Sequence, residues 1–407
     1  MVNNMNLIEF GTISHIKKGK KPLRQANKHQ DGYMPYVDIE AFETGNVKMY
    51  TDGEKCLPCK DGDILIVCDG SRSGFVGKAI DGYVGSTLAI ISADGMSQEY
   101  LYYFLQCKYA LLNTKKKGTG TPHLDANILN QQKLVVPSID EQKRIVARIE
   151  ELFSELDNGV ETLKKTKQQL TVYRQAVLKE AFEGKFTIHT SCNMELPWAS
   201  KEDTKSLPDI PQEWQYIALS NLGDLGRGKS KHRPRNDPKL FEGGKYPFLQ
   251  TGEVKAAKQY ITEYSKMYGE YGLQQSKLWP KGTLCITIAA NIAETAFLGI
   301  DACFPDSVVG FTPYEHILPE YVKHFIESQK LRLWAFAPAT AQKNINLDTL
   351  ENLIVPYCSV EEQKAVISEI EARMTICDNI EKTVDIALQQ AEAMRQSILK
   401  KAFEGGL

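Results

Sequence analysis

A long segment that occurs twice constrains this chain more than any other feature of its sequence. Residues 138–186 and 359–407 align without a gap at an offset of 221, with 19 identities in 49 positions. Weaker matches continue upstream: 16–20 with 225–229, 35–37 with 247–249, 61–66 with 281–286, and 134–137 with 353–356. Because a repeat decides which folds are possible, we interpret the chain as globule, helix, globule, helix.

Both copies of the repeat have the pattern of one long helix. Each opens with Ser-x-x-Glu, at Ser138 and Ser359, which is the sequence of a capping box. Apolar residues then recur at spacings of three and four, without proline, until a closing Phe-Glu-Gly in which Gly184 or Gly405 favours a helix end. A helix of about 43 residues extends roughly 64 Å.

An apolar stripe of that length needs a partner. The near-heptad spacing favours pairing of the two helices with each other, and the connectivity then makes them antiparallel. The alternative is that each helix packs only on its own globule. The predicted fold class is therefore two α/β globules in a tandem pseudo-repeat, separated by two long antiparallel coiled-coil helices.

The regions outside the helices have α/β patterns. We place the first globule at 1–137, the first helix at 138–186, a linker at 187–210, the second globule at 211–356 and the second helix at 357–407. Strands are predicted at 64–67, 88–91, 133–136, 284–288 and 353–355, and helices at 99–112 and 320–334.

Composition excludes several classes of protein. No apolar run approaches the roughly 18 residues of a membrane span and no signal pattern opens the chain, so we expect a cytoplasmic protein without a membrane. The nine cysteines have irregular spacing, which favours reduced thiols. Cys56 and Cys59 form a lone C-x-x-C, which is half of a zinc site. A chance pair is favoured over zinc, and no metal is expected.

Three polar loops recur at equivalent places in the two globules. Although the net charge is only −2, the first of these loops is strongly basic in both globules, as a phosphate-binding surface would be. Arg, Lys, Asn and Gln read base edges, and Lys with Ser or Thr suits phosphates. The candidate DNA-binding residues are Lys17, Lys18, Lys20, Lys21, Arg24, Ser71, Arg72, Ser73, Lys115, Lys116, Lys117, Thr119, Thr121, Arg227, Lys229, Lys231, Arg233, Arg235, Asn291, Gln342, Lys343 and Asn344.

Catalytic motifs are missing from the sequence. It contains no G-x-S-x-G and no H-E-x-x-H, and its single match to the phosphate-loop pattern G-x-x-x-x-G-K-[ST], at 223–230, overlaps the second basic run. The Asn-Pro-Pro-Tyr type of motif found in adenine methyltransferases is absent too. We therefore expect no catalytic residues in this chain.

Several local motifs, in this order and with the helical repeat, resemble the specificity subunits of type I restriction-modification systems along essentially the whole chain. The motifs are Leu-Pro-Asp-Ile-Pro-Gln-Glu-Trp at 207–214, Gly-Thr-Gly-Thr-Pro-His-Leu at 118–124, Val-Pro at 136–137 with Glu-Gln at 141–142, and Val-Pro at 355–356 with Glu-Gln at 362–363. The first globule departs from the family pattern because it lacks the Pro-x-x-Trp lead-in.

This resemblance implies roles for each part. The globules would be target-recognition domains that each read one half of a bipartite site in double-stranded DNA. The helices would space them and dock two methyltransferase subunits, and restriction subunits with motor and nuclease activity would join. The chain would bind no cofactor, while its partners would use S-adenosylmethionine, ATP and Mg. Alternatives are a coiled-coil adaptor that binds only protein and an RNA-binding accessory domain; a self-contained methyltransferase is opposed by the missing motif.

Overall fold

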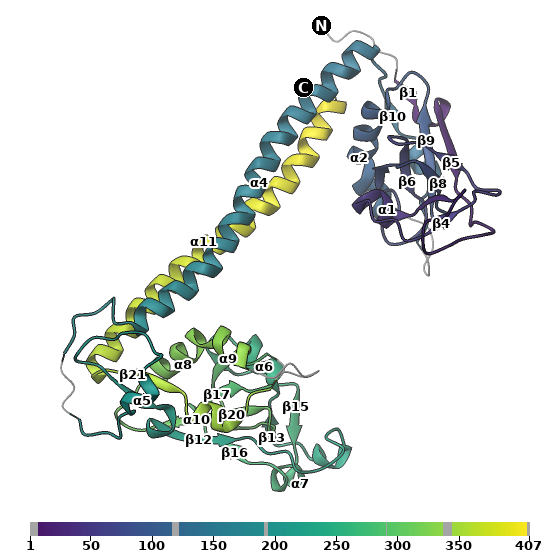
Figure 1. Ribbon diagram of the computed structural model, residues 1–407. Helices are drawn as coiled ribbons and strands as arrows, with labels where there is room; N and C mark the ends of the chain where they lie inside the picture. The colour runs from purple at the N-terminus through teal and green to yellow at the C-terminus, as the bar shows by residue number, and fades with distance from the viewer. Residues whose placement is uncertain (1–6, 116–121, 191–193, 290, 337–343, 405–407) are drawn as a thin grey trace. The chain divides into compact units, whose positions relative to one another are not determined.

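The protein is described here by a computed structural model, which covers residues 7–115, 122–190, 194–289, 291–336 and 344–404. The chain divides into two compact units, one of residues 1–165 with 384–407 and the other of residues 166–383. Each unit contains one globule together with part of both long helices (Figure 1). Within the described ranges, no helix combines the length and the apolar character that crossing a bilayer requires.

The first globule is an α/β domain built around two four-stranded sheets. Its elements are β1 (Ile8–Glu9), η1 (Phe10–Thr12), β2 (Ser14–Lys18), β3 (Met34–Val37), α1 (Ile39–Thr44), β4 (Tyr50–Thr51), β5 (Pro58–Cys59), β6 (Ile64–Val67), β7 (Val76–Lys78), β8 (Gly82–Val84), β9 (Leu88–Ala93), α2 (Gln98–Thr114), α3 (Ala126–Asn130) and β10 (Lys133–Leu134). The sheets have the orders β2-β9-β6-β7 and β4-β3-β8-β5, and β1 pairs with β10.

Strand β6 lies inside this globule because all four of its side chains are apolar and buried. Ile64 and Ile66 join a core that contains Phe104 of α2. Leu65 and Val67 face the opposite way, into a core that contains Val37. A continuous apolar run is typical of a strand covered on both faces.

The second globule repeats this plan with longer additions. Its elements are α5 (Lys201–Thr204), β11 (Gln215–Ala218), η2 (Leu219–Asn221), β12 (Gly223–Arg227), η3 (Pro238–Leu240), β13 (Tyr246–Phe248), α6 (Thr251–Ala256), β14 (Tyr260–Ile261), β15 (Lys266–Tyr268), α7 (Glu270–Gln274), β16 (Leu278–Trp279), β17 (Leu284–Thr287), β18 (Thr295–Leu298), β19 (Ala302–Cys303), β20 (Val308–Pro313), α8 (Pro319–Ser328), α9 (Lys330–Phe336), α10 (Leu347–Glu351) and β21 (Ile354–Tyr357). The sheets are β12-β20-β17-β18-β14, β15-β13-β19-β16 and β11-β21.

The two repeated segments form the helices α4 (Ile139–Phe182) and α11 (Val360–Phe403), each 44 residues long. They lie side by side within each unit (Figure 1). In the first unit Arg395 pairs with Asp157. In the second, Arg174 Nη2 lies 2.7 Å from Asp378 Oδ1. Positions later in α4 therefore pair with positions earlier in α11, which confirms the predicted antiparallel pair.

Both helix starts differ from the predicted capping box in one respect. The Ser138 and Ser359 hydroxyls accept the expected backbone hydrogen bonds, from Glu141 N at 3.4 Å and Glu362 N at 3.3 Å. The glutamate side chains bind elsewhere: Glu141 to Arg144 at 2.7 Å, and Glu362 to Thr187 at 2.8 Å. A neighbouring arginine of the same helix therefore replaces the reciprocal hydrogen bond at the first helix start, and a long-range partner replaces it at the second.

The glutamine that follows each of these glutamates fastens its helix to a globule. Gln142 is fully buried; its Nε2 donates to Gly95 O at 2.6 Å and to Pro137 O at 3.0 Å, and its Oε1 accepts from Ser97 N at 2.8 Å. Because the Gln142 side chain binds three backbone groups from two segments, it sets the angle at which α4 leaves the sheet.

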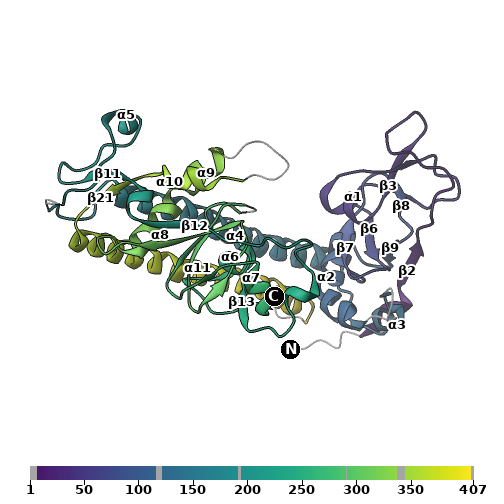
Figure 2. The ribbon, with the colours of Figure 1, turned by 90° about the horizontal axis from the view of Figure 1, so that it is seen from below.

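The far ends of the helices pack with aromatic residues. Phe182, at the end of α4, contacts Tyr321 and Phe325 of α8, with ring centroids 5.0 and 5.2 Å apart. Figure 2 shows the ribbon of α8 beside the long helices. Phe403, at the end of α11, contacts Tyr100 and Phe104 of α2, at 5.0 and 5.6 Å. Each globule therefore holds the beginning of one long helix and the end of the other.

The chain between α4 and the second globule is packed. α4 ends at Phe182, before the predicted 186, and Gly184 takes a left-handed φ of +73° as expected of a C-terminal cap. Gly405 lies outside the described residues. Trp198 pairs with Ile217 of β11, and its ring lies 5.7 Å from that of Tyr357. The predicted linker is thus largely part of the second globule's surface.

Candidate nucleic-acid interface

The three candidate loops of the first globule meet at one edge of its sheet. β2 and β6 both end there, so the basic run after β2 lies near the loop that follows Val67. Asp69 joins the loops: its Oδ2 lies 2.8 Å from Lys18 Nζ and its Oδ1 lies 2.7 Å from His123 Nδ1. Gly70 N also donates to Pro122 O at 2.8 Å.

Asp69 keeps a negative charge at the centre of this edge. Burial raises the pKa of Asp69, but hydrogen bonds from Lys18 and His123 outweigh this effect and lower it below its usual range. Lys17, Lys20, Lys21 and Arg24 of the same basic run are exposed. The carboxylate thus fixes Lys18, and a polyanion would approach mainly the other, exposed cations of the run.

The second loop of this globule presents fewer side chains than its sequence indicates. Ser73 is fully buried, and its hydroxyl donates to Gly70 O at 2.6 Å, so it shapes the loop. Arg72 is held by both carboxylate oxygens of Glu43 and lies 4.3 Å above the Phe75 ring. Ser71 is exposed.

The third loop is only partly described. Lys115 is exposed at the end of α2. The candidates Lys116, Lys117, Thr119 and Thr121 lie outside the described residues.

The basic run of the second globule starts at the equivalent sheet edge, where β12 ends. Arg227, Lys229, Lys231, Arg233 and Arg235 are all exposed. Arg227 Nε donates to Asp306 O at 2.5 Å, Arg235 Nη2 lies 2.7 Å from Asp306 Oδ1, and Arg233 Nη1 donates to His232 O at 2.8 Å. The arginines stabilise the loop and leave the side chains of Lys229 and Lys231 directed to solvent.

A glycine is required where each basic run leaves its strand. A Cβ on Gly19 would lie 2.3 Å from Gly85 O, and one on Gly228 would lie 2.3 Å from Pro305 O. Both distances are far shorter than van der Waals contact. Each basic run therefore passes tightly under the neighbouring connection between strands of its own globule. This explains the matching Lys-Gly-Lys and Arg-Gly-Lys sequences.

The loop after β17 holds an asparagine in a strained conformation. Asn291 is exposed and has a φ of +100°, a region that side chains with a Cβ rarely adopt. In the corresponding loop of the first globule, Gly70 has a φ of +111°. The exposed Asn344 belongs to the next segment, which Ala289 joins through a backbone bridge. Gln342 and Lys343 lie outside the described residues.

The sequence reasoning missed Asp69, His123 and Asp306 as organisers of these edges. Asp69 and His123 stood in the loops that were singled out, but only the fold shows that one carboxylate binds partners from both other loops. Asp306 is far from Arg227 in sequence, and no local pattern connects them. Acidic partners of basic loops are visible only in three dimensions.

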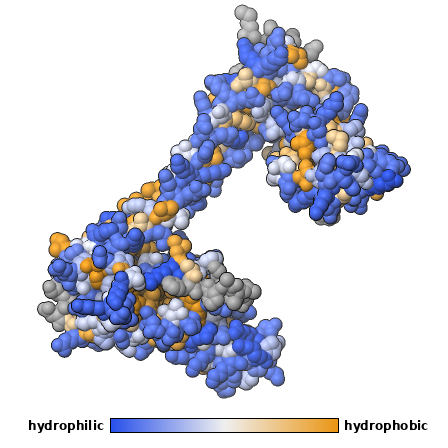
Figure 3. All heavy atoms as spheres, viewed as in Figure 1, coloured by the Kyte–Doolittle hydropathy of each residue, from blue (hydrophilic) through white to orange (hydrophobic). Residues whose placement is uncertain are grey.

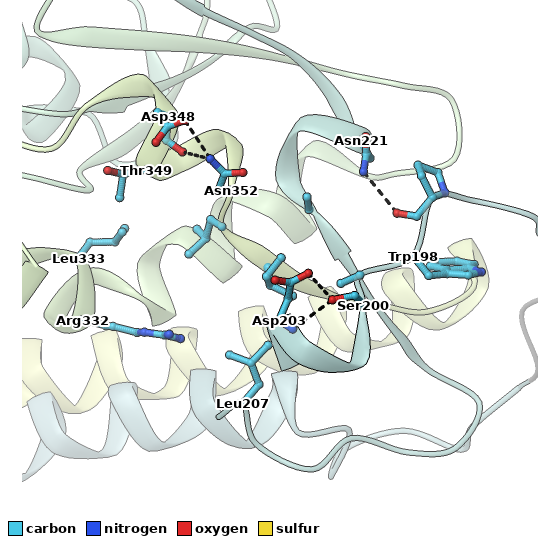
Figure 4. Close-up of a pocket in the computed structure, with 15 residues that line it drawn as sticks. Trp198, Ser200, Asp203, Leu207, Asn221, Arg332, Leu333, Asp348, Thr349 and Asn352 are labelled. Atoms are coloured by element: carbon cyan, nitrogen blue, oxygen red, sulfur yellow. Dashed lines mark hydrogen bonds between the residues drawn. The ribbon is translucent and has the colours of Figure 1, made fainter. Parts of the chain in front are cut away.

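No other described site competes with these edges. Among the described residues, no cluster of His, Cys, Asp or Glu is arranged to hold a metal ion. Cys56 and Cys59 are free thiols, and burial raises the pKa of Cys59 to about 12, which opposes a zinc thiolate. A hollow of about 690 Å³ lies beside Trp198, Ser200, Asp203, Arg332 and Asp348 (Figure 4). Its two carboxylates against one guanidinium do not suit a phosphate.

The model of one protein family, the type I restriction modification DNA specificity domain, matches this chain at residues 3–171 and 211–390. The chain belongs to this family. Each match takes in one globule and much of one long helix, so the family unit corresponds to the internal repeat. Family membership confirms the expectation of a specificity subunit and not of a catalytic one.

Named relatives of this family extend over nearly the whole chain. The specificity subunit of the type I restriction enzyme MjaVIII of Methanocaldococcus jannaschii is 25% identical over 98% of this chain and 92% of its own length. The EcoBI specificity subunit of Escherichia coli is 24% identical over 98% of this chain and 85% of its own length.

Solved structures show the same fold. A chain from a study of complex assembly and conformational transition of the type I system aligns with a TM-score of 0.73, at 19% identity over 99% of this chain and 98% of that one. The HsdS subunit of Thermoanaerobacter tengcongensis aligns with a TM-score of 0.56, at 19% identity over 99% and 97% of the two chains.

Proposed function

We propose that each globule reads one half of a bipartite site in double-stranded DNA, through the sheet edge where its three loops meet. One observation carries this proposal: equivalent edges of two equivalent globules bear exposed cations but different side chains. A shared frame with divergent loops suits two different half-sites. Phosphate contacts from the lysines would position each globule, and base-edge contacts would select the sequence.

The long helices would serve as the spacer between the half-sites. Two modest half-site affinities cooperate when a stiff connection raises the effective concentration of the second contact. Two domains that approach one face of a duplex need a separation near whole helical turns, of about 34 Å each. The helix pair would therefore select the gap between half-sites as well as join them.

We further propose that the helix pair docks two methyltransferase subunits. Apolar side chains lie at the surface of the helices (Figure 3). Tyr173 and Met394 occupy equivalent positions of the repeat and are 47% and 53% exposed. Equivalent apolar positions in both units support two similar partners. These partners would methylate adenine with S-adenosylmethionine, and restriction subunits would add ATP- and Mg-dependent activity.

The decisive experiment maps methylated adenines in DNA treated with the complete methyltransferase complex. We expect one motif with two specified halves and a fixed gap. Replacing residues 1–137 with the corresponding globule of a relative should change one half and leave the other. A change in both halves, or methylation that does not depend on this chain, contradicts the proposal.

The salt dependence of DNA binding gives a second test. Lys229→Ala should weaken binding to all sequences and reduce the slope of log affinity against log salt by about one. Lys281→Ala is the matched control, because Lys281 is exposed at the opposite end of β17. A protein-only adaptor, which the exposed apolar positions of the helices would also suit, would show no DNA affinity even in the complex.

A further inference from the structure

A histidine in the second basic run is held between two oxygen-bearing side chains. His232 is half-buried, and its Nε2 lies 2.7 Å from Asp237 Oδ2. Its Nδ1 lies 3.1 Å from the hydroxyl of Tyr271, the second residue of α7. The histidine and tyrosine rings meet edge to face, with centroids 5.6 Å apart. The three side chains form a chain of hydrogen bonds from the loop interior to its surface.

The direction of this chain follows from the donors and acceptors present. A backbone hydrogen bond from Lys239 and one from His232 keep the pKa of Asp237 below its usual range, so Asp237 is a carboxylate that only accepts. His232 Nε2 must then carry a proton, and in the neutral ring Nδ1 is left as an acceptor. With a neutral His232 ring, the Tyr271 hydroxyl therefore donates inward to Nδ1. Its lone pairs remain for an outside donor.

This hydroxyl lies beside the second basic run, which carries candidate DNA-binding residues. Tyr271 is 41% exposed. The run that carries His232 also carries the exposed Lys231, Arg233 and Arg235. The neighbouring carboxylate, Glu270, is engaged by Lys245 at 3.2 Å. A DNA backbone attracted to the cations would bring a groove edge close to α7.

The described residues of the first globule contain no counterpart to this arrangement. In the alignment of the two basic runs, the position of His232 corresponds to the exposed Leu23. Between β4 and β5 the first globule has a short turn, whereas the second has α7 between the equivalent strands β15 and β16. The Tyr271 arrangement is therefore one of the features by which the two reading edges differ.

We propose that Tyr271 is a specificity-determining residue, whose hydroxyl is fixed as a hydrogen-bond acceptor and reads an exocyclic amino group of one base. In the major groove that group is N6 of adenine or N4 of cytosine, whereas the keto oxygens of thymine and guanine would be repelled. Tyr271 contacts the DNA, and His232 and Asp237 are positioning residues. The proposal rests on the proposed function, since it assigns one contact within the second half-site.

The test uses the complete complex and the motif found for the wild-type protein. Tyr271→Phe keeps the ring and removes the hydroxyl, so discrimination at one base pair of the second half-site should fall about tenfold. The first half-site should be unchanged. Tyr264→Phe is the matched control, because Tyr264 is also exposed in this globule and has no part in the chain. An unchanged motif for Tyr271→Phe overturns the proposal.

A second variant tests the direction of the hydrogen bonds. Asp237 Oδ1 accepts from Lys239 N at 3.0 Å, while Oδ2 faces His232. Asp237→Asn keeps the first contact and turns an amide donor towards Nε2, so that Nδ1 becomes the donor to Tyr271. The freed hydroxyl proton should then favour a keto base, and the preferred base should change at the position that Tyr271→Phe relaxes. A change at another position contradicts the proposal, whereas a wild-type complex without a bipartite motif contradicts the proposed function instead.

Discussion

Gln142 and Gln363 occupy equivalent positions of the repeat and make the same three backbone hydrogen bonds in their respective units. Gln363 Oε1 accepts from Leu318 N at 2.9 Å, and its Nε2 donates to Cys358 O at 2.9 Å and His316 O at 3.3 Å. Gln142 makes the corresponding bonds to Ser97, Pro137 and Gly95. One acceptor and one donor group are required at each place, which an amide provides and a carboxylate does not.

Removing either glutamine should destabilise its unit strongly. Gln142→Ala and Gln363→Ala each strand buried backbone groups, so we expect the free energy of unfolding to fall by about 2–3 kcal/mol in urea titrations. Gln169→Ala, on the exposed surface of α4, is the control and should change little. Gln142→Glu should be at least as harmful, because it sets a charge against two carbonyl oxygens. An effect as small as that of Gln169→Ala would show that the contact is not structural.

The two arginine–aspartate pairs between α4 and α11 should stabilise the helix register modestly. Arg174 pairs with Asp378 and, at 3.1 Å, with Glu381, while the equivalent Arg395 pairs with Asp157 and lies 4.8 Å above the Phe153 ring. Exposed pairs contribute up to about 1 kcal/mol each. A double-mutant cycle of Arg174→Ala and Asp378→Ala should give a coupling of that size that shrinks in high salt. A coupling near zero would assign the register to apolar packing alone.

Glycine at position 291 should separate stability from DNA selection. Asn291→Gly relieves a strained φ, so the free energy of unfolding should rise by about 1 kcal/mol, as measured by urea titration. Selectivity at one base pair of the second half-site should fall, because the amide is lost. Ala293→Gly is the control: Ala293 has a φ of +61° but is buried, so it should stabilise without changing the motif. Unaltered selectivity in Asn291→Gly would remove Asn291 from the reading edge.

The second unit should lose stability in acid through one glutamate of α8. Burial raises the pKa of Glu327, but the hydrogen bond from His324 and the charge of Lys323 outweigh it and lower the pKa to about 2. Since the folded pKa is depressed, this stability is present above the unfolded value near 4.3 and is lost as the pH falls towards 2.

Glu327→Gln should therefore cost about 2–3 kcal/mol at neutral pH, and less as the pH falls below 4. Urea unfolding at several pH values measures both effects. Glu263→Gln, at an exposed position of the same globule, serves as the control. Equal losses for Glu327→Gln at pH 7 and pH 3 would contradict the assignment.

The helices and their pairing could be predicted from sequence because their signals are local and duplicated. The spacing of three and four, the serine at each start and Gly184 at one end specify a helix without reference to the rest of the chain. The central strand at 64–67 was equally clear, since a short apolar run suits a strand covered on both faces. Helix 320–334 was predicted as one, but the structure has α8 and α9, separated at Gln329.

The candidate site was harder to predict because side-chain partners in loops come from distant segments. Arg72 looked like a DNA contact, yet Glu43 holds it, and Ser73 is buried under its own loop. The loops themselves could be singled out because they recur at equivalent positions in the repeat. Which residues in them face outward depends on partners such as Asp69 and Asp306, whose position only the fold supplies.

The packing of Phe403 on Tyr100 and Phe104 ties the completion of the first globule to a segment that is synthesised after the whole second globule. Residues 1–137 leave the ribosome long before α11 exists, so α2 first emerges with an aromatic surface that nothing yet covers. That surface is closed only when the final turn of α11 is made. A ribosome that stalls within α11 would therefore release a protein whose earliest domain is the unfinished one.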